Sequence, residues 1–408
     1  MRTVGIGGST IEAELSRIIP TAHLVKPIPK AEFQSRIEKA CSLMKTKGVQ
    51  VLYLHSGTNL YYFTGMRWNP SERLVGALVF PNGKLHYIAP KFEEGTILDF
   101  MSVEGQVHCW EEHESPYELL TEILKNNHIT EGEIFIDETA PFFISDGILK
   151  APSAYTLSNA RPVISVCRMI KSDTEIAIIK HVMNITLDVQ KAAARILRVG
   201  ISAREVIDFI NEAHKRYGIT SDSYFCIVLF GVDSSFPHGV SKPKNLEMND
   251  MVLIDTGCVL YDYISDITRT YVFGEANNLQ RSIWNIEKET QQAAFNAAQV
   301  GNTCASVDLA SRKVLESNGL GPDYKLPGLP HRTGHGIGLD IHEYPYMVKG
   351  NDTVLKPGMC FSNEPMICVP NKFGVRLEDH IYITAEGPKW FTESSNTIEN
   401  PFGVFLKS

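Results

Sequence analysis

The chain has 408 residues, of which 43% are hydrophobic and 21% charged, with a formal net charge of −8 and a pI near 5.9. This length predicts two domains whose cores are large enough to fold without crosslinks. The acidic balance argues against a nucleic-acid-binding protein, because phosphate contacts need clustered Lys and Arg.

The cysteines and the hydropathy of the sequence indicate where in the cell the protein is expected. The eight cysteines are scattered and contain no CxxC pair, which is typical of reduced thiols rather than of disulfides or structural zinc. No stretch of about 18 apolar residues is present, so we expect no membrane span. Nor do we expect a secretory signal, because acidic residues come early in the N-terminal MRTVGIGGSTIEAEL. The sequence therefore predicts a cytoplasmic protein with no membrane and no nucleic acid as partner.

The first part of the chain has the pattern of an α/β domain. Residues 1–28 form an extension of weak pattern, in which GIGGST resembles half of a phosphate loop but follows no convincing strand. Apolar residues recur at helical spacing over residues 30–47. VQVLYLH is predicted as a strand, and GALVFP and KLHYIAP as a hairpin with a two-residue turn at Asn82 and Gly83. We place this first domain over residues 1–165.

The second part, residues 166–408, has an α+β pattern. The boundary falls within ARPVISVCRMIKSDTEI, which is predicted to lead from a strand into a long amphipathic helix capped at Ser172 or Asp173. A second helix is predicted between Ser202 and Gly218. Further strands and helices are then predicted in chain order: strands at 225–230, 251–274 and 358–386, and helices at 279–299 and 305–318.

Four acidic residues lie in or beside these later strands. Asp255 ends the apolar strand of VLIDTG, and Asp266 begins a strand that we expect to pair with it. Glu364 and Glu378 lie inside two apolar runs, FSNEPMICV and GVRLEDHIYIT, that we also expect to pair. Buried carboxylates are costly unless a cation, a shared proton or an ion pair neutralises them. A turn role for one aspartate, or an ion pair between Glu378 and Arg376, would leave the group as a whole unexplained.

The segment HRTGHGIGLDIHE adds His331, His335 and His342, set among glycines. His335 and the four carboxylates make a ligand set suited to two divalent cations. Its oxygen-rich character favours Mn²⁺, with Co²⁺, Fe²⁺ and Zn²⁺ as alternatives. Two such ions lower the pKa of a bound water and polarise a carbonyl group. His331 and His342 need not be ligands, because a neutral imidazole can donate to an oxyanion and protonate a leaving amine.

The motifs DTG…YISDITRT, HRTGHGIGLDIHE, NEPM and GVRLED resemble those of the prolidase, aminopeptidase P and methionine aminopeptidase family of metallopeptidases. The resemblance covers residue 165 to the end. It implies a pita-bread catalytic domain over residues 166–408. The first part, with NLYYFTG, resembles the α/β N-terminal domain of creatinase, prolidase and aminopeptidase P, which methionine aminopeptidases lack. The implied fold is therefore α+β, with a creatinase-like domain before the pita-bread domain.

Carried over to this sequence, the resemblance implies roles for individual residues. Glu364 would take a proton from the attacking water as well as bind metal. His342 would lie near the substrate carbonyl, and His238 near the scissile nitrogen. His331 would help to close the substrate pocket, and Arg376 would orient a ligand carboxylate. The implied metal ligands are Asp255, Asp266, His335, Glu364 and Glu378, and the implied catalytic residues are His238, His331, His342, Glu364 and Arg376.

The same resemblance implies hydrolysis of Xaa-Pro dipeptides or short peptides by a homodimer. Arg67 and Trp68 are candidates to reach a neighbouring subunit's site, with an exposed surface pair as the alternative. His380 either supports a ligand or is an ordinary strand residue. The rival activities on this fold are an ectoine-type hydrolase and a dimethylsulfoniopropionate lyase, and Gly257 stands where the lyase branch carries an aspartate. A non-catalytic binding module would have lost ligands, and this chain has lost none.

Overall fold

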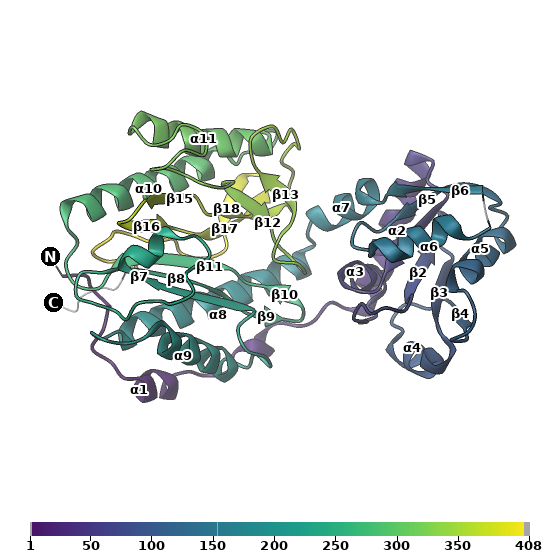
Figure 1. Ribbon diagram of the computed structural model, residues 1–408, viewed down its shortest axis with the longest axis horizontal. Helices are drawn as coiled ribbons and strands as arrows, with labels where there is room; N and C mark the ends of the chain where they lie inside the picture. The colour runs from purple at the N-terminus through teal and green to yellow at the C-terminus, as the bar shows by residue number, and fades with distance from the viewer. Residues whose placement is uncertain (1, 153, 404–408) are drawn as a thin grey trace. The chain divides into compact units, whose positions relative to one another are not determined.

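The computed structural model describes residues 2–152 and 154–403, which divide into two compact units (Figure 1). The larger unit consists of Met1–Pro27 and Met169–Ser408, and the smaller unit of Ile28–Arg168. In the sequence, the smaller unit is therefore inserted into the larger one.

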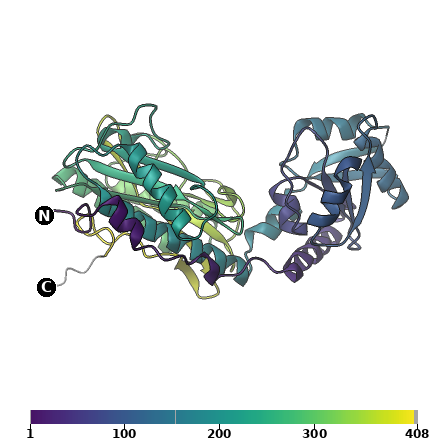
Figure 2. The same cartoon turned by 90° about the horizontal axis from the view of Figure 1, so that it is seen from below.

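The N-terminal segment differs from expectation. Residues 1–27, which the sequence pattern places in a domain of 1–165, group instead with the larger unit. Figure 2 shows this segment running along the larger unit. It packs there because Leu15 joins the unit's hydrophobic core, and because the buried carboxylate of Glu14 is paired with Arg195.

The smaller unit is built on a six-stranded sheet of order β4-β3-β2-β1-β5-β6. β2 pairs antiparallel with β1 and β3, whereas the outer pairs are parallel. Its elements are α2 (Lys30–Lys47), β1 (Val51–His55), α3 (Thr58–Thr64), β2 (Gly76–Val79), β3 (Leu85–Pro90), η2 (Lys91–Glu93), α4 (Glu94–Phe100), β4 (Gln106–Trp110), α5 (Pro116–Asn126), β5 (Glu131–Ile136), α6 (Phe142–Lys150), β6 (Ala154–Asn159) and α7 (Arg161–Met169).

Local sequence explains most of these elements. Helix α2 has the predicted bounds, and it ends at Gly48, which adopts a positive φ of 70° that favours glycine. Two predictions were wrong in detail. The β2–β3 loop is not a two-residue turn, because Phe80 N bonds to Lys84 O at 3.0 Å and leaves Pro81, Asn82 and Gly83 between them. The expected strand after residue 160 is helix α7, whose buried residues recur at helical spacing.

The larger unit contains two helix pairs with strands between them (Figure 1). Helices α8 and α9 contact the three-stranded antiparallel sheet β11-β8-β7, whereas α10 and α11 contact the strands of the other sheets. Its elements are α1 (Ile11–Ser16), η1 (Ala22–Leu24), α8 (Asp173–Ile196), α9 (Ala203–Arg216), β7 (Phe225–Phe230), η3 (Gly231–Ser235), β8 (Met251–Gly257), β9 (Val259–Leu260), β10 (Tyr263–Ile264), β11 (Ile267–Val272), α10 (Asn278–Ala297), α11 (Cys304–Ser317), β12 (Gly334–Gly336), β13 (Glu343–Met347), β14 (Cys360–Asn363), β15 (Met366–Val369), β16 (Phe373–Arg376), β17 (Asp379–Thr384) and β18 (Gly387–Trp390).

Capping fixes where the first helix pair begins. The Ser172 side chain accepts from Glu175 N while the Glu175 side chain accepts from Ser172 N, and Ser202 and Glu205 repeat this box at α9. The predicted cap at Ser172 and the predicted start after Ser202 are thus confirmed. The helix starts matter for function because α8 lies along the strands that carry Asp255 and Asp266.

Candidate metal and catalytic site

Two acidic residues lie at interruptions between strands rather than inside them. Glu364 follows β14 and precedes β15, and Glu378 lies between β16 and β17. β14 pairs with β17 in the five-stranded sheet β13-β12-β14-β17-β18, whereas β15 and β16 form a separate hairpin. The predicted pairing of the two runs is confirmed, but their continuity is wrong, because the chain passes from one sheet to the other at both acids.

Strand β11 faces these interruptions with a row of alternating polar side chains. Asp266 precedes the strand, and Thr268 lies directly opposite Asp255 of β8. The Thr268 hydroxyl donates to Glu378 Oε2 at 2.6 Å, and the Thr270 hydroxyl donates to the Arg376 carbonyl at 2.7 Å. The alternation of side chains along β11 therefore brings Asp255, Asp266 and Glu378 to one side.

His335 completes the cluster from β12. Its Nδ1 lies 3.0 Å from the Gly336 carbonyl, which can only accept, so Nδ1 carries a proton and Nε2 is the ring nitrogen that faces the carboxylates. Nε2 lies 2.9 Å from Glu364 Oε1 and 3.6 Å from Asp266 Oδ2. Gly334 permits this approach of strands, since a Cβ there would lie 1.9 Å from the Ser362 carbonyl oxygen.

The pKa values of the four carboxylates are changed by burial and by the charges of neighbouring groups. Burial and the neighbouring acids raise the pKa of Asp266 and of Glu378 well above their usual values. Burial also raises the pKa of Asp255, although its ion pair with Arg376 works in the opposite direction. Burial is the largest single influence on Glu364 and would raise its pKa, but His335, His331 and Arg376 together outweigh burial and lower the pKa.

This cluster fits a divalent cation. Among the described residues, Asp255 Oδ1, Asp266 Oδ1 and Glu378 Oε1 are buried without a hydrogen-bond partner. Single ligand atoms of Asp266, His335 and Glu378 all lie within 4.8 Å of one another. Buried carboxylate oxygens without donors are costly, and a cation is the neutralising group that this oxygen and imidazole donor set suits.

The other predicted histidines surround the cluster. The His342 ring packs edge-on against His335, with ring centroids 4.2 Å apart. Although His342 is open to solvent on one side, partial burial and then the neighbouring His335 lower its pKa to about 4. Burial also lowers the pKa of His331, whose Nδ1 donates to the Arg332 carbonyl at 2.7 Å. His238 lies exposed after η3, and its charge lowers the pKa of both other histidines.

Arg376 and His380 both lie next to the carboxylate cluster, but only Arg376 has hydrogen-bond partners in the described part of the chain. Arg376 is buried, pairs with Asp255 and donates from Nε to the Thr268 hydroxyl at 3.0 Å. It therefore connects two elements of the cluster, as expected for an orienting residue. His380 is fully buried, and neither ring nitrogen finds a partner in the described part of the chain. Its ring centroid lies 6.0 Å from that of His335.

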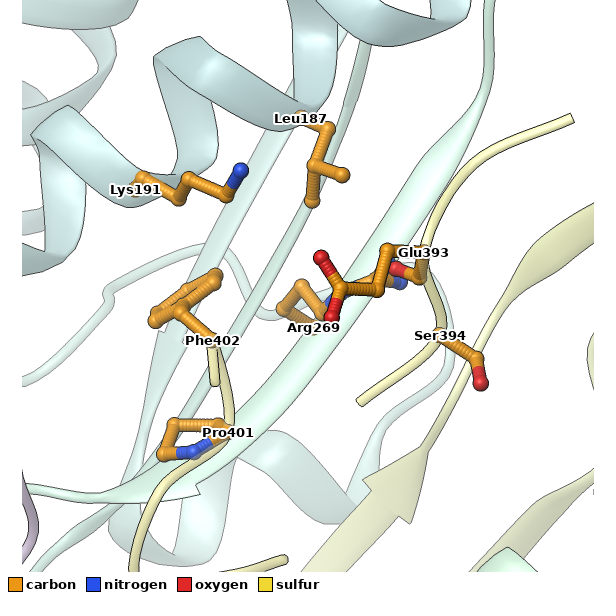
Figure 3. A pocket seen from close by; sticks show the side chains of 7 residues that line it. All are labelled: Leu187, Lys191, Arg269, Glu393, Ser394, Pro401 and Phe402. Carbon is orange, nitrogen blue, oxygen red and sulfur yellow. The ribbon is translucent and has the colours of Figure 1, made fainter. Parts of the chain in front are cut away.

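Arg269 supports the cluster from the other side of β11. It alternates with Thr268 and so leaves the strand in the opposite direction, where it donates to Glu378 O at 2.8 Å and pairs with Asp379 at 2.6 Å. Figure 3 shows Arg269 with Lys191, from helix α8, in the lining of a small pocket. This pocket lies behind the ligand strand and is distinct from the cluster of carboxylates.

Several supporting residues escaped the sequence prediction. Thr268 and Arg269 act through the alternation of β11, and the repeating polar pattern of SDITRT was an available signal for them. Ser362 accepts from His335 N at 2.9 Å and donates to Glu364 Oε1 at 3.0 Å. No sequence pattern marks Ser362, because its role arises from the pairing of β12 with β14.

The two candidates in the smaller unit are packed on their own unit. Arg67 donates to the Tyr61 hydroxyl at 3.0 Å and lies over the Tyr61 ring. Trp68 meets Phe100 edge-on, with ring centroids 6.2 Å apart.

Among residues 2–152 and 154–403, no helix is both long enough and apolar enough to span a membrane.

Comparison with known families places both units. Residues 177–385 match metallopeptidase family M24, and residues 36–170 match the creatinase/prolidase N-terminal domain. A protein of Bacillus subtilis named "Putative dipeptidase YkvY" is 32% identical over 360 residues that cover 88% of this chain and 98% of that protein. These matches confirm the resemblance drawn from the motifs.

Solved structures agree with the sequence matches. A prolidase from Thermococcus sibiricus is similar with a TM-score of 0.78 and 32% identity, covering 88% of this chain and 97% of that one. A dipeptidase, PepE, from Mycobacterium ulcerans is similar with a TM-score of 0.81 and 28% identity, covering 90% and 97%. The expected pita-bread fold with a creatinase-like domain before it is thereby confirmed.

Proposed function

The chain belongs to metallopeptidase family M24, and we propose that it is a dipeptidase that cleaves Xaa-Pro amide bonds with two divalent metal ions. Family membership makes it a metal-dependent peptidase. The finer proposal is carried by one observation: Asp266, His335 and Glu378 each offer a ligand atom within 4.8 Å of the others, and the two acids each keep an oxygen without a hydrogen-bond partner among the described residues. Relatives that are named prolidase and dipeptidase support the substrate class.

Five residues would hold the two ions: Asp255, Asp266, His335, Glu364 and Glu378. Their oxygen-rich character favours Mn²⁺, with Co²⁺, Fe²⁺ and Zn²⁺ as alternatives. Bound ions would supply a water of lowered pKa and polarise the scissile carbonyl. Arg376 would keep Asp255 in its binding orientation, because Asp255 Oδ2 is its ion-pair partner while Oδ1 stays available.

Glu364 and His342 would handle protons and charge. The lowered pKa of Glu364 keeps it ionised at neutral pH, so it can accept a proton from the attacking water. With a pKa of about 4, His342 is neutral at pH 7 and can donate a hydrogen bond to the oxygen that becomes negative. His238 is exposed and would protonate the leaving nitrogen, and the half-buried His331 would form a wall of the pocket beside it.

The test is turnover of a substrate panel by the Mn²⁺-loaded protein. The panel contains Ala-Pro, Ala-Ala, a longer Xaa-Pro peptide and ectoine. We expect cleavage of Ala-Pro that stops in chelator and returns with Mn²⁺. Turnover of ectoine without any peptide cleavage would overturn the peptidase assignment, and activity in protein shown to be metal-free would overturn the role of the cluster.

We further propose a cytoplasmic homodimer. The eight cysteines are all free thiols, which supports a reducing compartment. The homodimer follows from the resemblance to the prolidase branch, in which a partner's N-terminal domain reaches the neighbouring site. Arg67 and Trp68 remain the candidates for that contact. A native mass equal to that of one chain in solution would reject the homodimer.

A further inference from the structure

The loop that joins β12 to β13 carries His342 at its end. It spans residues 337–342, so it begins two positions after His335 and brings the chain back to it. The His342 ring contacts the His335 ring edge-on, with centroids 4.2 Å apart, but its other side is exposed to solvent. Because packing does not enclose this ring, its direction depends on the backbone of the loop that carries it.

A buried carboxylate lies inside this loop. Glu343 directly follows His342 and is 6% exposed. Its Oε1 lies against the backbone of Gly338, since a Cβ at that glycine would come within 2.7 Å of it. The Gly338 carbonyl in turn accepts from Ile264 N of β10 at 3.0 Å. The loop is thus held at its middle by β10, and it closes around the Glu343 side chain.

Lys171 supplies the cation for this carboxylate. Its Nζ lies 2.5 Å from Glu343 Oε1, and the two side chains are 1% and 7% exposed. The backbone of Lys171 is itself held, because its N–H donates to the Gly358 carbonyl at 2.8 Å and the preceding Ile170 forms an isolated bridge with Met359. Lys171 therefore reaches the loop from a backbone whose place is set by another part of the larger unit.

The ion pair contributes direction rather than stability. Removing two charges from water costs about as much as their attraction returns, so a buried pair adds little to the free energy of folding. A charged hydrogen bond nevertheless fixes the distance and angle between its two groups. Because Glu343 is joined to His342 through the backbone, its pair with Lys171 restrains the residue that carries the exposed ring.

We propose that Lys171 and Glu343 are positioning residues, which hold the 337–342 loop so that His342 can donate to the substrate. This inference rests on the proposed function, in which His342 donates a hydrogen bond to the oxygen that becomes negative. Neither Lys171 nor Glu343 would touch the substrate. Loss of the pair would let the His342 ring leave the position from which it donates, while the metal ligands and the substrate pocket stay in place.

The first experiment measures steady-state kinetics of Mn²⁺-loaded Lys171→Met on Ala-Pro. We expect kcat to fall about 10- to 100-fold, because an error of about 1 Å in the position of a catalytic group has an effect of this size. KM should stay within about threefold of the unmodified value and the metal content should not change, since neither the pocket nor the ligands are altered. Arg195→Met, which removes a cation from the buried Glu14 in the same unit, should keep kcat.

The second experiment tests whether Lys171 acts through His342. His342→Gln should lower kcat by about 10²- to 10³-fold, as loss of one donor to the developing charge does. Adding Lys171→Met to His342→Gln should lower kcat by less than about a further threefold, because the residue that Lys171 positions is already absent. A further loss as large as that of Lys171→Met alone would show that the two effects are independent, and it would reject the inference.

A third variant separates position from stability. Lys171→Met/Glu343→Leu replaces both charges by apolar groups, so no buried charge lacks a partner and the melting temperature should stay close to that of the unmodified protein. Its kcat should remain about 10-fold or more below the unmodified value, because an apolar contact has no preferred direction. Full recovery of kcat would assign the pair to stability alone and overturn the inference.

The unmodified protein distinguishes failure of this inference from failure of the proposed function. If it cleaves Ala-Pro while Lys171→Met keeps the full kcat, or loses activity only by losing metal, the inference is rejected and the proposed function stands. If the unmodified protein cleaves no peptide, the proposed function fails and the inference fails with it.

Discussion

Buried carboxylates occur in both units, and their surroundings differ. In the smaller unit, Asp137 is 1% exposed and accepts hydrogen bonds from Asn59 Nδ2 at 2.8 Å, from the Thr139 amide and hydroxyl at 2.9 and 2.8 Å, and from His55 N at 3.3 Å. In the larger unit, Asp255, Asp266 and Glu378 each keep one buried oxygen without a donor among the described residues.

The difference separates structural acids from ligand-binding acids. Burial raises the pKa of Asp137, and its hydrogen bonds partly offset this effect without any bound ion. For Asp266 and Glu378, burial and the neighbouring acids act in the same direction, so the protein itself does not neutralise them. Buried acids whose oxygens lack hydrogen-bond donors therefore indicate a bound ligand, whereas a buried acid with a full set of donors indicates a role in the fold.

The largest effect that we expect is on turnover. Glu364→Gln should lower kcat on Ala-Pro by about 10³-fold, because the attacking water loses its base. Steady-state kinetics of the Mn²⁺-loaded variant measure this loss. The matched control is Glu386→Gln, in the exposed β17–β18 turn, which should keep the full rate. Activity of Glu364→Gln close to that of the control would remove Glu364 from proton transfer.

The difference between the buried acids of the two units is tested by replacing one aspartate with asparagine in each unit. Asp137→Asn should lower the free energy of unfolding by about 1–3 kcal/mol, because an amide group would face donors that need an acceptor. In metal-free protein, Asp266→Asn should raise it by about 1 kcal/mol, because repulsion from the other acids is relieved. Thermal unfolding in chelator measures both. Destabilisation of the same size by both variants would contradict the division into satisfied and unsatisfied acids.

Glu287 of α10 provides the smallest and most specific test. It is fully buried, and neither carboxylate oxygen has a hydrogen-bond partner among the described residues, yet it stands apart from the cluster. Burial raises its pKa well above the usual value, and the Arg376 charge offsets this only in part. Burial therefore holds it as a neutral carboxylic acid, without the neighbouring acids that also raise the pKa of Asp266 and Glu378.

The pH dependence of Glu287 follows from this raised pKa. Its contribution to stability is fully present below the pKa of the unfolded chain, about 4.3, and is lost as pH rises through the folded value. Glu287→Gln lacks this loss. The variant should match the unmodified protein at pH 4.5 and gain on it by about 1–2 kcal/mol toward pH 8. Melting temperatures at several pH values check this, and a constant difference would show that Glu287 is ionised in the folded state.

Much of the fold could be predicted from local patterns. Helix α2 follows from apolar spacing, and α8 and α9 begin where Ser172 and Ser202 form capping boxes. The interruptions at Glu364 and Glu378 could not be predicted, because apolar residues continue on both sides of each acid. Only the change of pairing partner between two sheets ends the strands there.

The candidate site likewise contains residues that could be predicted from the sequence and residues that could not. The acids and His335 were predictable because charged residues in apolar strands are costly, and the motifs supplied their combination. Ser362 was not predicted. Serine is not unusual in a strand, and Ser362 reaches His335 only through the pairing of β12 with β14.

The inserted smaller unit also sets the order in which a growing chain can fold. Thr3 bonds to Gly274, 271 positions later, and Val4 N donates to Glu399 O. During synthesis the first residues therefore wait for partners that leave the ribosome much later, whereas the smaller unit has all of its strands by residue 159. The proposed metal ligands Glu364 and Glu378 also emerge late. Uptake of metal at this site would therefore wait until translation is nearly finished.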